Sequence, residues 1–336
     1  MKKYENMNDR ADEQPVKKRK FNLYNLLNPD KDGKEIPKES KNAPRDLKFF
    51  FKLAGRRFST IITLNIMLIL GNFPIIFFFL VLAGYFSKTA VSAQSVVFPT
   101  LYGAMQFGAE GASTAALFGV HGVLSTMRVL SVADYILLVV GAVLLLFTFG
   151  PVHCGITYIL RNIVRGVPIF LWQDFWDTIK KNLRQAWIIG ALDLTFLFLI
   201  VYDIIFFNAA LNGFLSSVLF WAAIFIGIFY FFMRMYLYLL TITFDLKIFK
   251  IFKNALIFSL LGIKRNLLAA LGILLCIGIN YVMLMVYFPI GFILPFIITV
   301  GMILFIEVYA AWPKIKQIMV DPYYNEDGSE KEQAPA

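Results

Sequence analysis

Six long apolar segments divide this sequence, and each is long enough to cross a lipid bilayer as a helix. A bilayer core of roughly 30 Å requires about 20 apolar residues in a helix. The chain is 59% hydrophobic and 16% charged, which suits lipid-facing helices better than a surface in water. The sequence therefore predicts an all-α, polytopic membrane helix bundle. The six predicted spans are Thr60–Leu82, Val132–Leu160, Ala186–Phe207, Leu215–Thr243, Leu268–Phe288 and Ile290–Trp312.

The basic residues lie almost entirely on alternate connections between these spans. Of the 32 Lys and Arg residues, 16 precede the first span, 5 lie in Arg161–Arg184, 5 lie in Lys247–Arg265 and 3 follow the last span. Lys and Arg close to span ends resist translocation across the membrane. We therefore expect a multi-pass membrane protein with its N-terminus and C-terminus both in the cytoplasm.

One connection does not fit a simple span or turn. The segment 85–131 holds few charges, is rich in Ala, Gly and Ser, and is interrupted by Pro99, Gly108 and Gly111. A single extra span here would move the later basic segments to the outside, whereas two extra spans or none would preserve the charge asymmetry. We expect an external loop with short surface or re-entrant helices, and the alternative is an extra helical hairpin.

The two ends of the chain are polar. Residues 1–48 are rich in Lys, Glu, Asp, Asn and Pro, which predicts a disordered basic cytoplasmic tail, and residues 317–336 form a second cytoplasmic tail. The membrane domain is expected over residues 49–316. No apolar core of a cleaved signal peptide follows Met1, so the first span is expected to act as the targeting signal. The net charge of +10 follows from topology, and no nucleic-acid partner is expected.

A short motif occurs twice, 84 residues apart. Ile179–Leu183 (IKKNL) recurs as Ile263–Leu267 (IKRNL), and each copy ends a predicted cytoplasmic segment. Each segment also has apolar and polar residues at helical spacing, which predicts two cytoplasmic interfacial amphipathic helices, at Ile169–Gln185 and from Lys247 onward. The repeat indicates an internal duplication. The alternative is that any loop entering the membrane from the cytoplasm needs basic residues.

The first of these interfacial segments offers a surface for a partner. Trp172, Phe175 and Trp176 are expected to anchor it to the membrane or to the bundle. The polar residues between them would remain available in the cytoplasm. The candidate docking face consists of Asp174, Asp177, Lys181 and Arg184.

Five charged residues fall inside predicted spans, and three of them, Asp193, Arg234 and Glu307, form a candidate intramembrane charge network. An ionised side chain in hydrocarbon costs several kcal/mol unless it is paired or hydrated. Asp193 lies about 10 Å and Arg234 roughly 14 Å from the cytoplasmic ends of their spans, as judged from the helical rise. The two can therefore pair, and Glu307 lies in the same leaflet and competes for Arg234. This candidate charge network is either a structural lock or a relay for protons or substrate.

Motifs of common enzymes are missing from this sequence. It contains no Walker A loop, no HExxH motif, no nucleophile elbow around a serine and no paired carboxylates on a soluble domain. His153 and Cys154 are adjacent and point to different faces of a helix, so no metal site is expected. We expect no enzymatic activity and no cofactor.

The sequence resembles the YesL family, multi-span proteins of Gram-positive bacteria whose activity is not established. The likeness extends from Phe49 to about Trp312. It is carried mainly by Gly150-Pro151, Gly155-Ile156-Thr157-Tyr158, Arg161-Asn162, Arg165-Gly166, Trp172, Asp174-Phe175 and Lys181-Asn182, with further matches at Leu64-Asn65, Pro74, Thr243-Phe244-Asp245-Leu246 and Lys253-Asn254-Ala255-Leu256.

Relatives in that family are often encoded beside carbohydrate ABC importers and sensor kinases. The resemblance implies a non-enzymatic accessory or regulatory protein of a carbohydrate uptake or sensing system, with an importer permease or a sensor kinase as partner besides the lipid bilayer. The alternative is a small secondary transporter or channel that uses the intramembrane charges. Neither the substrate nor the oligomeric state follows from the sequence.

The charge asymmetry makes a direct topological prediction. Reporter tags placed at Lys3 and at Ala336 should both report a cytoplasmic location, because the basic segments hold both ends on that side. Enzymatic reporters that are active on only one side of the membrane measure this directly. An external location of either tag would contradict the six-span model.

Overall fold

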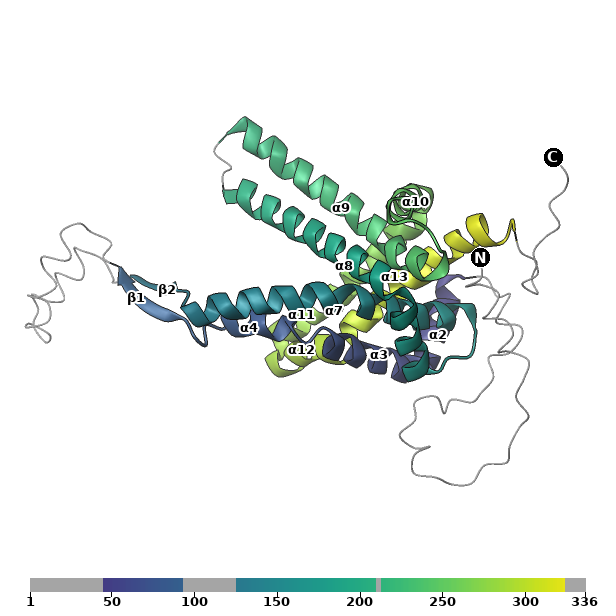
Figure 1. Ribbon diagram of the computed structural model, residues 1–336, viewed down its shortest axis with the longest axis horizontal. Coiled ribbons are helices and arrows are strands. Elements are labelled where there is room, and N and C mark those ends of the chain that lie inside the picture. Colours follow the sequence, from purple (N-terminus) through teal and green to yellow (C-terminus); the bar gives the residue numbers. More distant parts are fainter. Residues whose placement is uncertain (1–44, 93–124, 210–212, 324–336) are drawn as a thin grey trace, which may run out of the picture. The chain divides into compact units, whose positions relative to one another are not determined.

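The computed structural model describes residues 45–92, 125–209 and 213–323. These residues are helical except for a two-stranded ribbon and short connections (Figure 1), and the all-α prediction is confirmed. Contacts between them define two compact units. The first contains the described residues up to Asn72 and from Leu146 onward, and the second is Phe73–Leu145.

Most of the helices belong to the first unit. They are α2 (Leu47–Arg56), α3 (Phe58–Gly71), α8 (Leu171–Ala209), α9 (Phe214–Thr243), α10 (Ile248–Leu261), α11 (Ile263–Val286), α12 (Phe288–Leu294), the π-helical segment η4 (Pro295–Thr299), α13 (Val300–Ile315) and the π-helical segment η5 (Lys316–Val320). The second unit contains α4 (Ile75–Leu82), β1 (Lys88–Ser92) and β2 (Ser125–Val129). Helix α7 (Val132–Arg165) begins in the second unit and ends in the first.

Within the described residues, five helical segments are long and apolar enough to cross a membrane. They are Val132–Arg165, Leu171–Ala209, Phe214–Thr243, Ile263–Val286 and Phe288–Val320. They correspond to the last five predicted spans, although the predicted span Leu268–Phe288 runs two residues past the end of its helix. A sixth span is obtained if α2 and α3, which are bent by 74° relative to each other, are counted as one. The described residues are thus those of a polytopic membrane protein, with five or six candidate spans among them.

The first predicted span, Thr60–Leu82, is not one continuous helix. Helix α3 ends at Gly71, and α4 begins only at Ile75, directly after Pro74. Proline disfavours helical backbone in the residue before it and lacks the N–H that a helix needs. The end of α3 is closed by Asn72, whose side chain donates to the carbonyl oxygen of Leu68 at 3.0 Å. The prediction overlooked this break because the residues on both sides of it are apolar.

Helix α8 corrects a second prediction. The prediction places a separate interfacial helix at Ile169–Gln185, yet the helix begins at Leu171 and continues without interruption into the span, as one helix of 39 residues. No proline lies within it, so nothing forces it to end. At 1.5 Å per residue it is about 58 Å long, nearly twice the hydrocarbon thickness. A large part of α8 must therefore lie outside the hydrocarbon.

The second copy of the repeated motif folds differently. Helices α10 and α11 are separate and meet at Gly262, whose position in the first copy is occupied by Thr178, within continuous α8. Tyr236 donates a hydrogen bond to Asn266 at 2.7 Å, and a Cβ atom on Gly262 would overlap the same tyrosine hydroxyl. Glycine is required here for this close approach. The two copies thus share a sequence pattern and differ in backbone at the start of the span.

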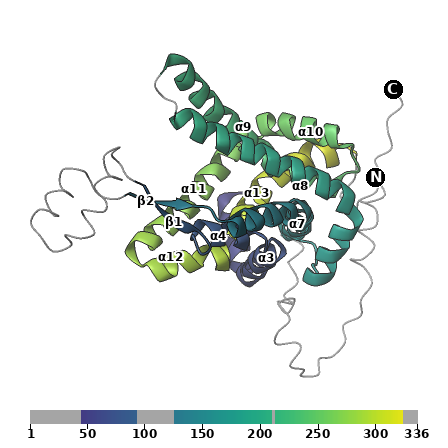
Figure 2. The same ribbon diagram turned by 60° about the vertical axis from the view of Figure 1, so that its left-hand side comes forward.

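Helices α7 and α8 approach each other through two glycines in the first unit. A Cβ atom on Gly150 would overlap the carbonyl oxygen of Ala186, and one on Gly190 would overlap the backbone of Gly150. Small residues allow membrane helices to pack with their backbones in contact. One turn further along α7, the ring of Phe175 covers Gly155. This tight packing holds the part of α7 that contains Gly150 and Gly155 against α8. Helices α8 and α9 also lie side by side, as both Figures 1 and 2 show.

The last span contains an irregular segment whose backbone groups form hydrogen bonds with a side chain from α3. The amide of Asn65 donates to the carbonyl oxygens of Pro295 and Phe296, at 3.1 and 2.6 Å, and its oxygen accepts from the N–H of Gly301 at 2.6 Å. These backbone groups lie in or beside η4, where the regular helical pattern is lost. Because a membrane offers no water to pair such groups, Asn65 fixes α3 to the last span.

In the second unit, the ends of the segment 85–131 form an antiparallel ribbon. Lys88 on β1 lies opposite Val129 on β2, and Ser92 lies opposite Ser125. Surface helices were expected in this segment, and its described ends are instead strands. Residues 93–124 lie outside the described residues. The ribbon leads into α7, whose first turn is capped by hydrogen bonds between Ser131 and Asp134.

The glycine contact between α7 and α8 yields a stability prediction. The substitution Gly190→Ala should lower the free energy of unfolding by about 1–3 kcal/mol, because the helices must separate to admit a methyl group. Gly278→Ala on α11 is the matched control, since a Cβ atom there meets nothing within 4 Å. Thermal unfolding in detergent micelles measures both variants. Equal stability of the two would contradict the contact.

Candidate functional site

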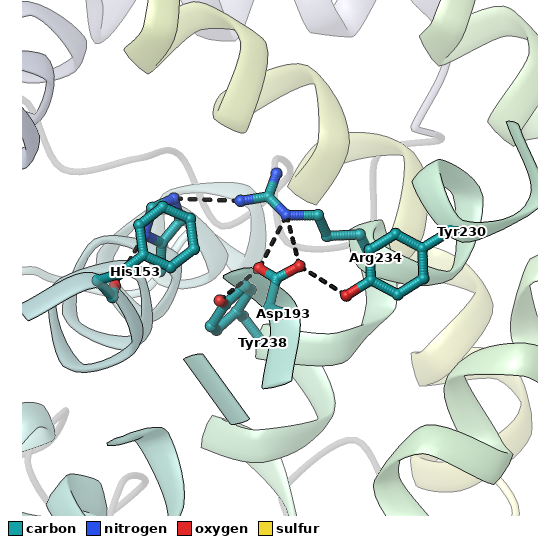
Figure 3. A network of polar contacts seen from close by, with 6 residues as sticks. His153, Asp193, Tyr230, Arg234 and Tyr238 are labelled. Atoms are coloured by element: carbon teal, nitrogen blue, oxygen red, sulfur yellow. Dashed lines mark hydrogen bonds and ion pairs between the residues drawn. The ribbon is translucent and has the colours of Figure 1, made fainter. Parts of the chain in front are cut away.

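A cluster of polar side chains lies inside the first unit. It combines His153 from α7, Asp193 from α8, three residues of α9 and Glu307 from α13. The residues from α9 are Tyr230, Arg234 and Tyr238, and their spacing of four places them on one face of that helix. Figure 3 shows His153, Asp193 and these three side chains directed toward one another.

Asp193 is the centre of the cluster and is completely buried. Arg234 donates through Nε to both carboxylate oxygens, at 2.9 Å to Oδ2 and 3.1 Å to Oδ1. Tyr230 donates its hydroxyl to Oδ1 at 2.7 Å, and Tyr238 donates to Oδ2 at 2.6 Å. A carboxylate has about four acceptor positions, so these contacts occupy all of them. The structure therefore brings Asp193 and Arg234 together and leaves the carboxylate no capacity for another donor.

His153 adds a third helix to the cluster. Its Nδ1 lies 2.9 Å from the carbonyl oxygen of Phe149, and its Nε2 lies 3.4 Å from Nη2 of Arg234. A carbonyl oxygen can only accept and a guanidinium can only donate. This geometry assigns the hydrogen to Nδ1 and leaves Nε2 as the acceptor, which is a neutral imidazole. The ring also stacks on Tyr238, with centroids 5.2 Å apart.

The ion pair joins α8 to α9, and the hydrogen bond that Arg234 donates to His153 adds α7. Only 17% of the Arg234 side chain is exposed, and none of the Asp193 side chain is. An unpaired charge buried in this environment would cost several kcal/mol. The sequence located the pair because both residues lie at similar depth. It gave no indication of Tyr230, Tyr238 or His153, whose participation depends on how the helices are rotated.

Glu307 does not take part in the ion pair. It is buried on α13, and the charges of Arg234 and Asp193 act on it electrostatically. In the part of the chain that the structure describes, it makes no hydrogen bond and no ion pair. The expected competition for Arg234 is thus decided in favour of Asp193, because Nε faces α8. Glu307 remains a buried acid beside an occupied guanidinium.

The candidate docking face on α8 is only partly exposed. Lys181 and Arg184 are exposed and Asp177 is half-buried, but Asp174 is buried. The carboxylate of Asp174 accepts a hydrogen bond from the N–H of Phe170 at 2.8 Å, just before α8 begins. An acidic residue near a helix start commonly caps it in this way. Asp174 therefore belongs to the fold and is removed from the docking face.

The membrane anchors predicted beside this face are also divided. Phe175 is buried against α7, whereas Trp172 and Trp176 are exposed.

Among the residues that the structure describes, no group of three or more His, Cys, Asp or Glu side chains is arranged to hold a metal ion.

Long apolar helices around a buried ion pair define the chain as an integral membrane protein of the helical, multi-span class. Residues 133–204 match the model of a family described as protein of unknown function, DUF624. The match spans α7 and most of α8, including His153 and Asp193, and it ends before Arg234 and Glu307. It supports an uncharacterised family of multi-span proteins. No curated protein and no solved structure matches the chain.

The ion pair can be tested with a double-mutant cycle. Asp193→Ala and Arg234→Ala should each destabilise the protein by about 3–5 kcal/mol, because each leaves its partner buried without a counter-charge. The double variant should cost less than the two single losses added together, by about 0.5–3 kcal/mol. Thermal unfolding in one detergent gives all four values. Additive losses would show that the two residues are not coupled.

Two controls sharpen this cycle. Asp203 is another acid on α8, and it makes no hydrogen bond with the described residues. Asp203→Ala should therefore change stability little. Asp193→Ala should cost more in a Glu307→Gln background than in the wild type, because Glu307 is then no longer able to replace the lost carboxylate. An unchanged cost would mean that Glu307 does not reach Arg234.

Proposed function

We propose that this protein is a non-enzymatic accessory or regulatory partner of a carbohydrate uptake or sensing system in a bacterial plasma membrane. One observation carries the proposal. The four acceptor positions of Asp193 are filled by Arg234, Tyr230 and Tyr238 of the same chain. A charge cluster that is satisfied internally stabilises a bundle, and it has no free group to bind a solute at that carboxylate.

The remaining polar groups are suited to contacts outside the membrane. Lys181 and Arg184 are exposed on the part of α8 that precedes the span, and they form the proposed docking face; α10 carries a separate exposed basic surface, Lys250 and Lys253, that is not part of this face. Helix α10 lies beside α9, so both basic surfaces belong to the first unit. Exposed Arg and aromatic residues such as Trp176 are frequent at protein interfaces. The resemblance to the YesL family supports an importer permease or a sensor kinase as the partner.

A second candidate function is a small secondary transporter or channel. It is favoured by Glu307, which is buried near Arg234 without a hydrogen bond or ion pair to the described residues. Acids inside membranes often belong to ion or proton pathways. On this alternative, Arg234 would exchange between Asp193 and Glu307 during transport. Solute movement would then depend on Glu307.

The two functions are separated by one set of variants. The tagged full-length protein should co-purify from its native host with subunits of an ABC importer or with a sensor kinase, identified by mass spectrometry. Lys181→Glu combined with Arg184→Glu should reduce that recovery at least about ten-fold without lowering thermal stability, because like charges repel across an interface. Lys250→Glu combined with Lys253→Glu on α10 is the charge-matched control.

The accessory function predicts that the purified protein moves no sugar in proteoliposomes. Transport by the protein alone, lost in Glu307→Gln, would overturn the proposal and establish the second candidate. Recovery of neither an importer nor a kinase would also contradict it. If both charge-reversed variants lose the partner equally, the docking face is not confined to α8.

A further inference from the structure

Helix α2 lies where the predicted N-terminal tail, residues 1–48, meets the membrane domain, and the sequence predicts no helix there before the first span at Thr60. Its ten residues begin after Asp46, whose side chain caps the helix by accepting from the N–H of Phe49 at 2.8 Å. The helix is bent by 74° from α3. Membrane spans are tilted on average by about 20° from the bilayer normal. If α3 enters the bilayer in this way, α2 runs close to the plane of its surface.

The inner face of α2 is fixed to the bundle. Phe50 stacks on Phe305 with ring centroids 5.4 Å apart, and Leu53 and Ala54 are buried. The chain just before the helix is also held. Tyr309 donates its hydroxyl to the carbonyl oxygen of Asp46 at 2.6 Å, and Arg265 donates to the carbonyl oxygen of Arg45 at 3.3 Å. The orientation of α2 is therefore set by α11 and α13.

The outward side of α2 has two flanks of different chemistry. Lys48, Lys52 and Arg56 follow one another at intervals of four residues, so they form one basic stripe. All three are exposed and make no ion pair or hydrogen bond with the described residues. The helix contains no acidic residue. The neighbouring flank carries Leu47 and Phe51, which are 54% and 70% exposed.

We propose that α2 is a binding surface for anionic phospholipid headgroups of the membrane leaflet that it borders. A helix parallel to a bilayer, with an apolar flank and a basic flank, inserts the first among acyl chains and directs the second to the headgroups. Leu47 and Phe51 provide the insertion, and the stripe of Lys48, Lys52 and Arg56 provides the charge. An acidic protein segment would satisfy the stripe but not the exposed phenylalanine beside it.

The binding strength follows from the number of charges. Each basic residue at an anionic membrane surface raises affinity by roughly five-fold. Three such residues on one stripe should enrich anionic lipid around α2 over neutral lipid with the same acyl chains. This enrichment should be local, because charges in salt are screened over about 8–10 Å.

The test places a fluorescent probe on the exposed flank. The variant Phe51→Trp is reconstituted in vesicles of phosphatidylglycerol and phosphatidylcholine in which only one of the two lipids carries brominated chains. Bromine quenches only nearby tryptophans, and the signal of the native tryptophans is subtracted with the parent protein. Phosphatidylglycerol should quench the probe more strongly than its share of the bilayer predicts.

The basic stripe is then removed in the same background. Replacing Lys48, Lys52 and Arg56 by Gln should lower the preference for phosphatidylglycerol well beyond the roughly five-fold that a single charge contributes, because three charges are lost. Lys52→Gln alone should give a smaller loss and keeps the test decisive if the triple variant does not fold. The matched control replaces Lys180, Lys181 and Arg184, three exposed bases on α8, by Gln and should leave the preference unchanged.

Three results would overturn the proposal. The probe could show no preference for phosphatidylglycerol, the preference could survive loss of the stripe, or the α8 control could remove it equally. Absence of quenching by either brominated lipid would show that Phe51 is not in the bilayer. An acidic protein segment would then be the better occupant of the stripe.

Discussion

The ion pair between Asp193 and Arg234 is the interaction on which the bundle depends most. In hydrocarbon neither charge is tolerated alone, so the helices that carry them must meet at this point. Tyr230 and Tyr238 donate the remaining hydrogen bonds to the carboxylate of Asp193. His153 accepts from the guanidinium of Arg234 and so connects it to α7. The close approach of Gly150 and Gly190 lies only three residues along α8 from Asp193. Packing and electrostatics therefore reinforce each other at the junction of α7, α8 and α9.

The same demand for internal partners explains the irregular parts of the first unit. Pro313 lacks an N–H and so leaves a carbonyl oxygen of α13 without its usual donor. Arg265 from α11 donates to the carbonyl oxygens of Tyr309 and Ala310, in this turn. Asn65 serves η4 in the same manner. Side chains from neighbouring helices thus replace the water that would pair these groups in a soluble protein.

The functional proposals follow from which charges are already used. Asp193 and Arg234 are paired, and Asp174 caps α8, so these residues serve the fold. The exposed bases on α2 and α8 remain for lipids and protein partners. Glu307 belongs to neither group, and it is the residue that most clearly separates an accessory protein from a transporter. Most buried charges are thus hydrogen-bonded within the protein, whereas the exposed bases are accessible to other molecules.

The sequence by itself determined the all-α membrane class, five of the six span positions and the depth at which Asp193 and Arg234 lie. These depend on local composition and on spacing along a helix. It did not reveal the break before Pro74, the uninterrupted α8 or the ribbon of β1 and β2, because an apolar pattern is the same in bent, broken and straight helices. Only the tertiary structure decided that Arg234 pairs with Asp193 rather than Glu307, that Asp174 faces inward, and that α2 turns by 74° from α3. Those outcomes depend on the rotation and crossing of helices, which are set by contacts between residues far apart in the chain.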